Sequence, residues 1–189
     1  MTIPNLNPGD ADTDESDMLI LSLSTTPANP GKEAIRPPFP WATDRRATVY
    51  SIEHLQASGI ATITGSVKCK RCDKTFEVEY DLAAKFSEVA EYITMHSHEM
   101  RHRAPAVWSS PTLPDCRFCG QRNCAKPAAS EKKREINWLF LFLGQMVGCC
   151  KLSELKYFCK HTKQHRTGAK DRVLYLTYLQ IFNQLSPAP

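Results

Sequence analysis

The chain has 189 residues, among them 8 cysteines and 13 prolines, and carries a formal net charge of +4. Hydrophobic residues make up 42% and charged residues 23% of the total, which provides enough apolar side chains for a packed core. These figures exclude a collagen, a long coiled coil and a polytopic membrane protein, and they fit one domain with a tail.

The modest net charge conceals two segments of opposite sign. Residues 1–36 carry six acidic and two basic side chains, and seven of the 13 prolines fall within the first 40 residues. Because this segment has no periodic apolar pattern, it is predicted to be a disordered arm, with residues 37–189 forming a single folded domain. Residues 101–172 carry 15 basic and five acidic side chains, which favours an anionic partner.

The first half of the domain is predicted to contain a hairpin between two helices. Ser51 is expected to cap a short helix that ends at Gly59. Residues 60–68 are strand-like, and residues 75–82 alternate between apolar and acidic side chains, as in a half-buried antiparallel strand. The two strands would form a hairpin with the sequence CKRC at its tip. Apolar residues at helical spacing then predict an amphipathic helix over residues 83–96.

The second half is predicted to be helical after a proline-marked loop. Helices are expected over residues 131–149, 153–161 and 170–185. The longest apolar run, residues 136–150, is shorter than the ~20 residues that span a bilayer, so it is expected to be a buried core helix. The predicted fold class is α+β, with a small antiparallel zinc-ribbon-like hairpin sheet, several packed helices and the disordered arm before them.

The strongest chemical signal is a pair of CxxC motifs, Cys69 with Cys72 and Cys116 with Cys119. Zinc takes four soft or borderline ligands in a tetrahedron, and two tight turns that face each other can supply all four. No secretory signal is recognisable, so the thiols are expected to stay reduced rather than form disulfides. We therefore predict one structural Zn²⁺ ion. A redox CxxC pair is disfavoured because CKRC lies between two strands, not between a strand and a helix.

The other cysteines offer weaker alternatives. A second metal site could use members of one group in the second half of the chain, namely Cys149, Cys150, Cys159, His161 and His165. Cysteines on helices are more often buried apolar side chains, and Cys124 is likewise expected to be a core or spare thiol.

An enzymatic alternative rests on open metal sites. His98, Glu99 and His102 match the HExxH pattern of zinc peptidases, in which both histidines share one helix face and the glutamate is the base. Pro105 stops a helix within one turn of His102, which argues against this interpretation. A metal-dependent hydrolase or nuclease would use either these three residues or Cys159, His161 and His165.

Basic residues in the second half could contact nucleic acid through its phosphates. The candidates are Lys132, Lys133, Arg134, Lys160, Lys163, Arg166, Lys170 and Arg172. A solvated helix face is the alternative, because no recognisable DNA-reading motif accompanies them.

The acidic arm contains the sequence LxLxL, formed by Leu19, Leu21 and Leu23. In an extended chain these leucines share one face and can dock into a groove of a folded partner. The motif resembles the plant amphiphilic repression motif, which implies a corepressor-like protein as the partner of the arm.

Several long segments carry a family resemblance. They are PPFPWATDRRATVYSIEHL, ITGSVKCKRC, FEVEYDL, PDCRFCG, EKKREINWLFLFLGQMVGCC and KYFCKHTKQHRTGAKDRVLYLTYL. Together they resemble a plant-specific uncharacterised family, domain of unknown function 7086, from about Pro37 to Leu185. The resemblance implies a plant protein with leucine-rich repression-like motifs near its N-terminus, and it supplies no established activity.

These observations favour a non-enzymatic zinc-binding nuclear regulator. The zinc-ribbon domain would be a transcription-related interaction module, and the arm would recruit a corepressor. The alternatives are the metal-dependent hydrolase or nuclease, and a zinc-stabilised protein-binding adaptor without a nucleic-acid role. We expect the protein in the nucleus, with the cytoplasm as the alternative, and neither secreted nor bound to a membrane.

Overall fold

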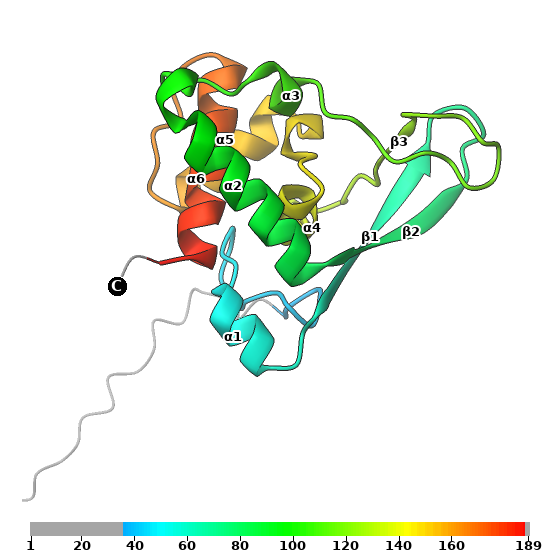
Figure 1. The fold of residues 1–189 in the computed structure, drawn as a ribbon, viewed down its shortest axis with the longest axis horizontal. Coiled ribbons are helices and arrows are strands. Elements are labelled where there is room, and N and C mark those ends of the chain that lie inside the picture. Colours follow the sequence, from blue (N-terminus) through cyan, green and yellow to red (C-terminus); the bar gives the residue numbers. More distant parts are fainter. Residues whose placement is uncertain (1–35, 188–189) are drawn as a thin grey trace, which may run out of the picture. The chain divides into compact units, whose positions relative to one another are not determined.

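The computed structural model describes residues 36–187, which belong to one compact unit, Ala34–Pro189. Predictions that concern residues 1–35 and 188–189 lie outside the described residues. In chain order the elements are α1 (Ile52–Ala57), β1 (Thr62–Cys69), β2 (Thr75–Asp81), α2 (Leu82–Met100), α3 (Ala106–Ser109), β3 (Ala125–Pro127), η1 (Lys133–Glu135), α4 (Trp138–Leu143), η2 (Val147–Cys149), α5 (Leu152–His161) and α6 (Lys170–Leu185), as Figure 1 shows. The α+β fold class predicted from the sequence is confirmed.

The three strands form an antiparallel sheet in the order β2-β1-β3. β1 and β2 pair from Thr62 opposite Asp81 to Lys68 opposite Thr75. The predicted alternation along β2 is confirmed, since Phe76 is buried and the acidic side chains between the apolar ones are exposed. β3 was not predicted, and it adds a third strand only beside the last three residues of β1.

α4 is the helix that joins the helical layer to the sheet. All six of its residues are buried, as expected for a helix that is apolar on every side. It packs on β1 at Gly65, where an added Cβ atom would clash with the ring of Phe140. Tyr80 of β2 stacks on the same ring, with 5.2 Å between the centroids. The missing side chain at Gly65 thus lets α4 approach the middle of the hairpin.

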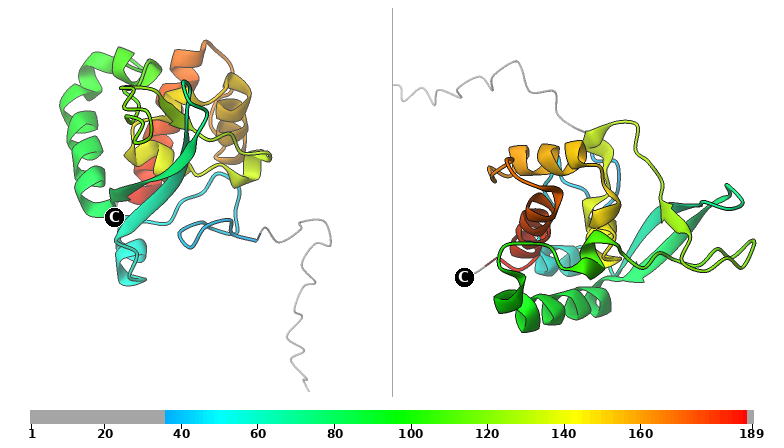
Figure 2. Two further views of the ribbon diagram at one scale, coloured as in Figure 1. Left: turned by 90° about the vertical axis from the view of Figure 1, so that its right-hand side faces the viewer. Right: turned by 90° about the horizontal axis from the view of Figure 1, so that it is seen from above.

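α2 and α6 pack against α4, and α5 packs along α6; Figure 2 gives two further views of this arrangement. α6 has the predicted bounds, and α5 begins one residue before its predicted start. α2 extends four residues beyond the predicted end at His96. Within residues 36–187, no helix is long and apolar enough to cross a membrane.

The prediction of one helix over residues 131–149 is wrong, because this stretch is divided into η1, α4 and η2. The Asn137 side chain begins α4 by accepting a hydrogen bond from the Phe140 N–H. It also donates to the Thr64 carbonyl and accepts from the Trp41 indole N–H. Beyond Gly144, Gln145 takes a left-handed conformation with φ of 53°, which ends the helical run.

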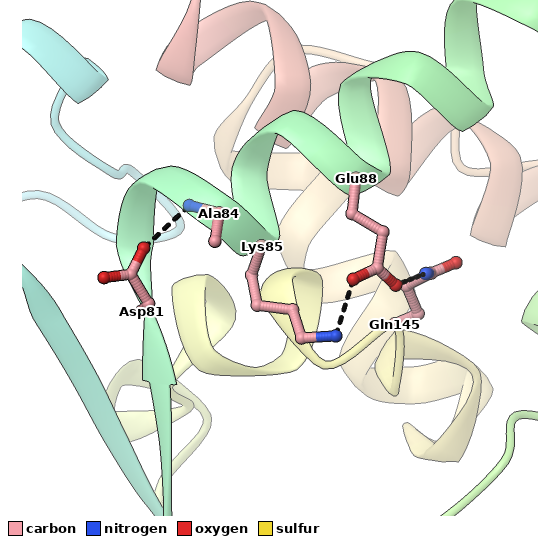
Figure 3. A network of polar contacts seen from close by, with 5 residues as sticks. All are labelled: Asp81, Ala84, Lys85, Glu88 and Gln145. Atoms are coloured by element: carbon pink, nitrogen blue, oxygen red, sulfur yellow. Dashed lines mark hydrogen bonds and ion pairs between the residues drawn. The ribbon is translucent and has the colours of Figure 1, made fainter.

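The start of α2 follows β2 without a loop and is fixed by polar contacts (Figure 3). Asp81 Oδ1 accepts a 2.7 Å hydrogen bond from the Ala84 N–H, which makes Asp81 the N-cap. Lys85 Nζ lies 2.6 Å from Glu88 Oε2, and Glu88 Oε1 accepts from Gln145 Nε2 at 3.3 Å. These contacts join the first turns of α2 to the chain that follows α4.

The N-cap of α2 gives the first testable prediction. Asp81→Ala should lower the free energy of unfolding by about 1 kcal/mol, because a backbone N–H at the helix start loses its acceptor. Asp81→Asn retains an oxygen acceptor and serves as the control. Chemical denaturation measures both, and equal losses in the two variants would contradict the capping role.

The contact of Gly65 with Phe140 gives the second testable prediction. Gly65→Ala should destabilise the fold by about 1–3 kcal/mol, since the new methyl group forces the ring or the strand to move. Ser66→Ala is the matched control in the adjacent, exposed position, and should change stability by no more than about 0.5 kcal/mol. If thermal and chemical unfolding of both variants match the wild type, α4 does not depend on this close approach.

Candidate metal centre

The two CxxC motifs meet at the end of the sheet farthest from α1 (Figure 1). The first begins at the last residue of β1 and continues into the turn to β2, and the second lies in the loop that precedes β3. We call residues 69–74 the first knuckle and residues 116–121 the second knuckle.

The first knuckle is shaped by backbone hydrogen bonds around Cys69. The Cys69 N–H donates to the Lys74 carbonyl at 3.0 Å, and the Asp73 N–H donates to the Cys69 carbonyl at 3.1 Å. Asp73 has φ of 58°, in the left-handed region. The Arg71 and Cys72 N–H groups donate to Cys69 Sγ at 3.3 and 3.5 Å. The turn thus directs backbone donors at a sulfur atom.

The second knuckle repeats this construction. The Cys116 N–H donates to the Gln121 carbonyl, and the Gly120 N–H donates to the Cys116 carbonyl, both at 2.9 Å. Gly120 has φ of 66° and corresponds to Asp73 of the first knuckle. The Phe118 N–H donates to Cys116 Sγ at 3.4 Å. Two segments far apart in the sequence therefore form the same type of turn, each with N–H groups that favour a thiolate.

Further contacts hold the knuckles against each other. The Lys70 N–H donates to the Cys124 carbonyl at 3.1 Å, and Cys69 pairs with Ala125 in the register of β1 and β3. Arg71 also donates from its guanidinium to Gln121 Oε1 at 3.1 Å. β3 therefore serves to bring the second knuckle to the end of β1.

The four predicted ligands form one cluster. Cys69 Sγ lies 3.8 Å from Cys119 Sγ, and Cys72 Sγ lies 3.6 Å from Cys116 Sγ. All four sulfur atoms lie within 4.8 Å of one another, and the four residues are buried or half-buried. The structure thus brings together the cysteines that the sequence singled out, and they could hold a metal ion.

The thiols of the cluster differ in acidity. The N–H of Cys72 is the main reason why the pKa of Cys69 falls to about 6. Burial acts against ionisation of Cys116, but the N–H groups of Cys119 and Phe118 outweigh it and lower its pKa. The Lys74 N–H acts to lower the pKa of Cys72, which burial and the adjacent Cys116 sulfur nevertheless raise to about 12. Hydrogen bonds between the sulfurs thus lower the pKa values of Cys69 and Cys116 and raise that of Cys72. A divalent cation would favour the thiolate form of all four cysteines.

Cys124 is the residue of the site that the sequence analysis missed. It was expected to be a core or spare thiol, and it is buried in the core, but its Sγ also lies 3.5 Å from Cys69 Sγ. It donates to the Gln121 carbonyl at 3.0 Å, and burial together with the Cys69 sulfur raises its pKa to about 11. Cys124 is thus a protonated neighbour of the four-cysteine group. The signal available in the sequence was its spacing of five residues from Cys119.

The structure does not assemble the HExxH motif on one helix face. His98 and Glu99 lie in the last turn of α2, but that helix ends at Met100. His102 follows the end in a left-handed conformation, with φ of 61°. Its ring packs edge-on against Tyr175, with 5.8 Å between the centroids. The three residues therefore lack the geometry of the peptidase site.

The predicted second cluster is not brought together either. Its members were Cys149, Cys150, Cys159, His161 and His165. Cys159 is buried beside Thr177, with 3.8 Å between Sγ and Oγ1, and the His161 ring lies against Tyr157. Within residues 36–187, the four knuckle cysteines are the one group of three or more histidine, cysteine or acidic residues within reach of a shared metal ion.

The candidate nucleic-acid contacts are spread over three places. They are Lys132, Lys133 and Arg134 around η1, Lys160, Lys163 and Arg166 at and after the end of α5, and Lys170 and Arg172 in the first turn of α6. Lys132 pairs with Glu135 at 3.7 Å, and Lys170 donates to the Gly148 carbonyl at 2.9 Å. Their role stays a prediction. Leu19, Leu21 and Leu23 lie outside the described residues.

A hairpin sheet that ends in two facing cysteine knuckles, with helices packed on it, defines a zinc-ribbon-like α+β domain with a candidate metal centre. Residues 52–185 match the family described as Domain of unknown function (DUF7086), and the chain belongs to this family. Neither a curated protein nor a solved structure matches the chain.

The distinction between Cys69 and Cys124 gives the third prediction. Cys69→Ser should reduce the bound metal from about one ion per chain to none, because a neutral hydroxyl is a poor substitute for a thiolate ligand. Cys124→Ser should retain the ion, since a serine still can donate to the Gln121 carbonyl. Elemental analysis of the purified proteins measures both. Loss of metal in both variants would make Cys124 part of the ligand set.

Proposed function

We propose that this protein is a non-enzymatic, zinc-stabilised regulator that acts as a transcription-related interaction module in the nucleus. The observation that carries the proposal is the cluster of Cys69, Cys72, Cys116 and Cys119 at the end of the sheet. Four protein ligands would fill a tetrahedral zinc site and leave no position for a substrate or a reactive water. Such a site is structural.

Zinc is the ion that suits the cluster. A tetrahedron with Zn–S bonds of about 2.3 Å has sulfur atoms about 3.8 Å apart. The distances of 3.8 Å between Cys69 and Cys119 and 3.6 Å between Cys72 and Cys116 agree with this geometry. Four thiolates also favour zinc over hard cations such as Mg²⁺ or Ca²⁺. When bound, the ion would neutralise the thiolates and hold the two knuckles together.

The metal would contribute most where the domain is otherwise weakest. β3 has three residues, and the second knuckle reaches β1 through only a few backbone hydrogen bonds. Zinc binding contributes on the order of 10–16 kcal/mol in small zinc-finger peptides. A fraction of this is enough to fix the loop that carries Cys116 and Cys119.

The recruiting element we propose is the arm with Leu19, Leu21 and Leu23. Support comes from the sequence, in which alternate leucines stand among acidic and proline-containing segments. An extended peptide with this pattern can place its leucines in successive pockets of a folded partner. The partner we propose is a corepressor-like protein, and the folded domain would then determine where the recruited complex acts.

The fourth prediction tests recruitment. The full chain, tethered to a promoter through a fused DNA-binding domain, should repress a reporter gene. Changing Leu19, Leu21 and Leu23 to alanine should abolish most of this repression, because three apolar anchors are lost at once. Nuclear localisation of the tagged chain is recorded in the same cells.

The control changes Ile3, Leu6 and Met18 to alanine, which removes apolar side chains from the same arm without touching the alternating leucines. Repression should persist in this variant. Equal repression by the wild type and the leucine variant would overturn recruitment through the arm, while zinc content and folding would remain as separate tests of the domain.

A further inference from the structure

We propose that the tip of the domain, which comprises residues 68–74 and 115–126, binds single-stranded nucleic acid. Phe118 would be the platform on which a base stacks, and the basic side chains around it would contact the phosphates. This surface is distinct from the basic residues predicted from the sequence. This inference rests on the proposed function in one respect, because the bound metal would hold the two knuckles together. It does not depend on recruitment of a partner by the arm.

The first argument is the exposure of Phe118. Its side chain is 50% exposed, although its N–H is held by Cys116 Sγ in the second knuckle. The ring meets the buried Phe76 edge to face, with centroids 5.8 Å apart and planes at 77°. The backbone and one edge of the ring are thus fixed, while half of the side chain stays in water. A pre-ordered exposed ring is what base stacking requires.

The second argument is the position of cations over this ring. Lys74 Nζ lies 4.9 Å from the centroid of Phe118. Arg117 Cζ lies 5.5 Å from the same centroid and 5.0 Å from that of Phe76. Both side chains are exposed. A base that stacks on Phe118 would take the place of one of these exposed cations on the ring, and the displaced cation would remain within reach of its phosphate.

The third argument is the charge of the whole tip. Its seven basic side chains are all exposed: Lys68, Lys70, Arg71, Lys74, Arg117, Arg122 and Lys126. The two acidic ones are already engaged, because Asp73 pairs with Lys68 at 3.1 Å and Asp115 accepts the Asn123 N–H. The tip thus carries a net charge of +5. A zinc ion with four thiolates contributes −2. The net charge of the zinc-bound tip would therefore be +3, which attracts an anionic partner.

The form of the surface favours single strands over a duplex. Of the described residues, those of the tip form turns and strand ends and contain no helix that could enter a major groove. In a duplex the base faces are covered by their neighbours, so that Phe118 could reach them only after unstacking. An acidic protein segment would satisfy the charges but would make no particular use of the exposed ring. Single-stranded DNA or RNA uses both features.

The fifth prediction uses the full, zinc-loaded chain and fluorescence anisotropy with labelled 15-nucleotide oligothymidine and oligouridine, and with a 15-base-pair DNA duplex. Phe118→Ala should weaken single-strand binding about tenfold, the effect of losing one stacked base, without changing the salt dependence. The double variant Lys70→Gln with Arg122→Gln should also weaken binding. Because two phosphate contacts are lost, the magnitude of the slope of log K against log salt should fall by about 1.4.

Two controls keep the result specific. Val107→Ala removes a side chain that is 52% exposed on α3, away from the tip, and should leave binding unchanged. Phe118→Trp retains an aromatic platform and should preserve binding. Zinc content is measured for every variant, so that a collapsed knuckle is distinguished from a lost contact.

Several outcomes would overturn the proposal. They are no binding to either oligonucleotide at low salt, equal affinity of wild type and Phe118→Ala, and a duplex bound more tightly than both single strands. Loss of binding only in Lys160→Gln with Lys163→Gln would place the contact on the end of α5 instead. Preference between the DNA and RNA strands identifies which sugar the tip accepts, and either one supports the inference.

Discussion

The tip of this domain depends on one electrostatic constraint. Four sulfur atoms within 4.8 Å of one another favour a single compact arrangement only if the charge of their thiolates is compensated. The backbone compensates part of it, because N–H groups of Arg71, Cys72 and Phe118 point at sulfur atoms. A divalent ion at the centre would compensate the rest and join two segments that few other contacts connect.

The sequence predicted the features that local patterns determine. A period of two fixed the buried face of β2, and a period of 3.6 located α6 with its observed bounds. The spacing within each CxxC motif singled out the four cysteines that cluster in the structure, because a tight turn places both sulfurs on the same side. These signals need no knowledge of distant contacts, and the structure agrees with each.

The features that the sequence missed depend on residues far apart in the chain. The apolar run at residues 136–150 has the composition of one helix, but Asn137 is engaged by Trp41 and Thr64, and this fixes where α4 begins. β3 is only three residues long, so it has no detectable period of its own. Cys124 could be placed beside Cys69 only once the pairing of β3 with β1 was known.

Within each knuckle, the backbone and the side chains have different roles. In both turns the backbone N–H groups between the cysteines donate to the sulfur atoms, while side chains such as those of Lys70 and Phe118 are exposed. Changing these two side chains leaves the N–H donors and the contact between Arg71 and Gln121 in place. The body behind the tip is anchored independently, through the contact of Phe140 with Gly65. The exposed positions within the knuckles are therefore those at which binding specificity can change at the smallest cost to folding.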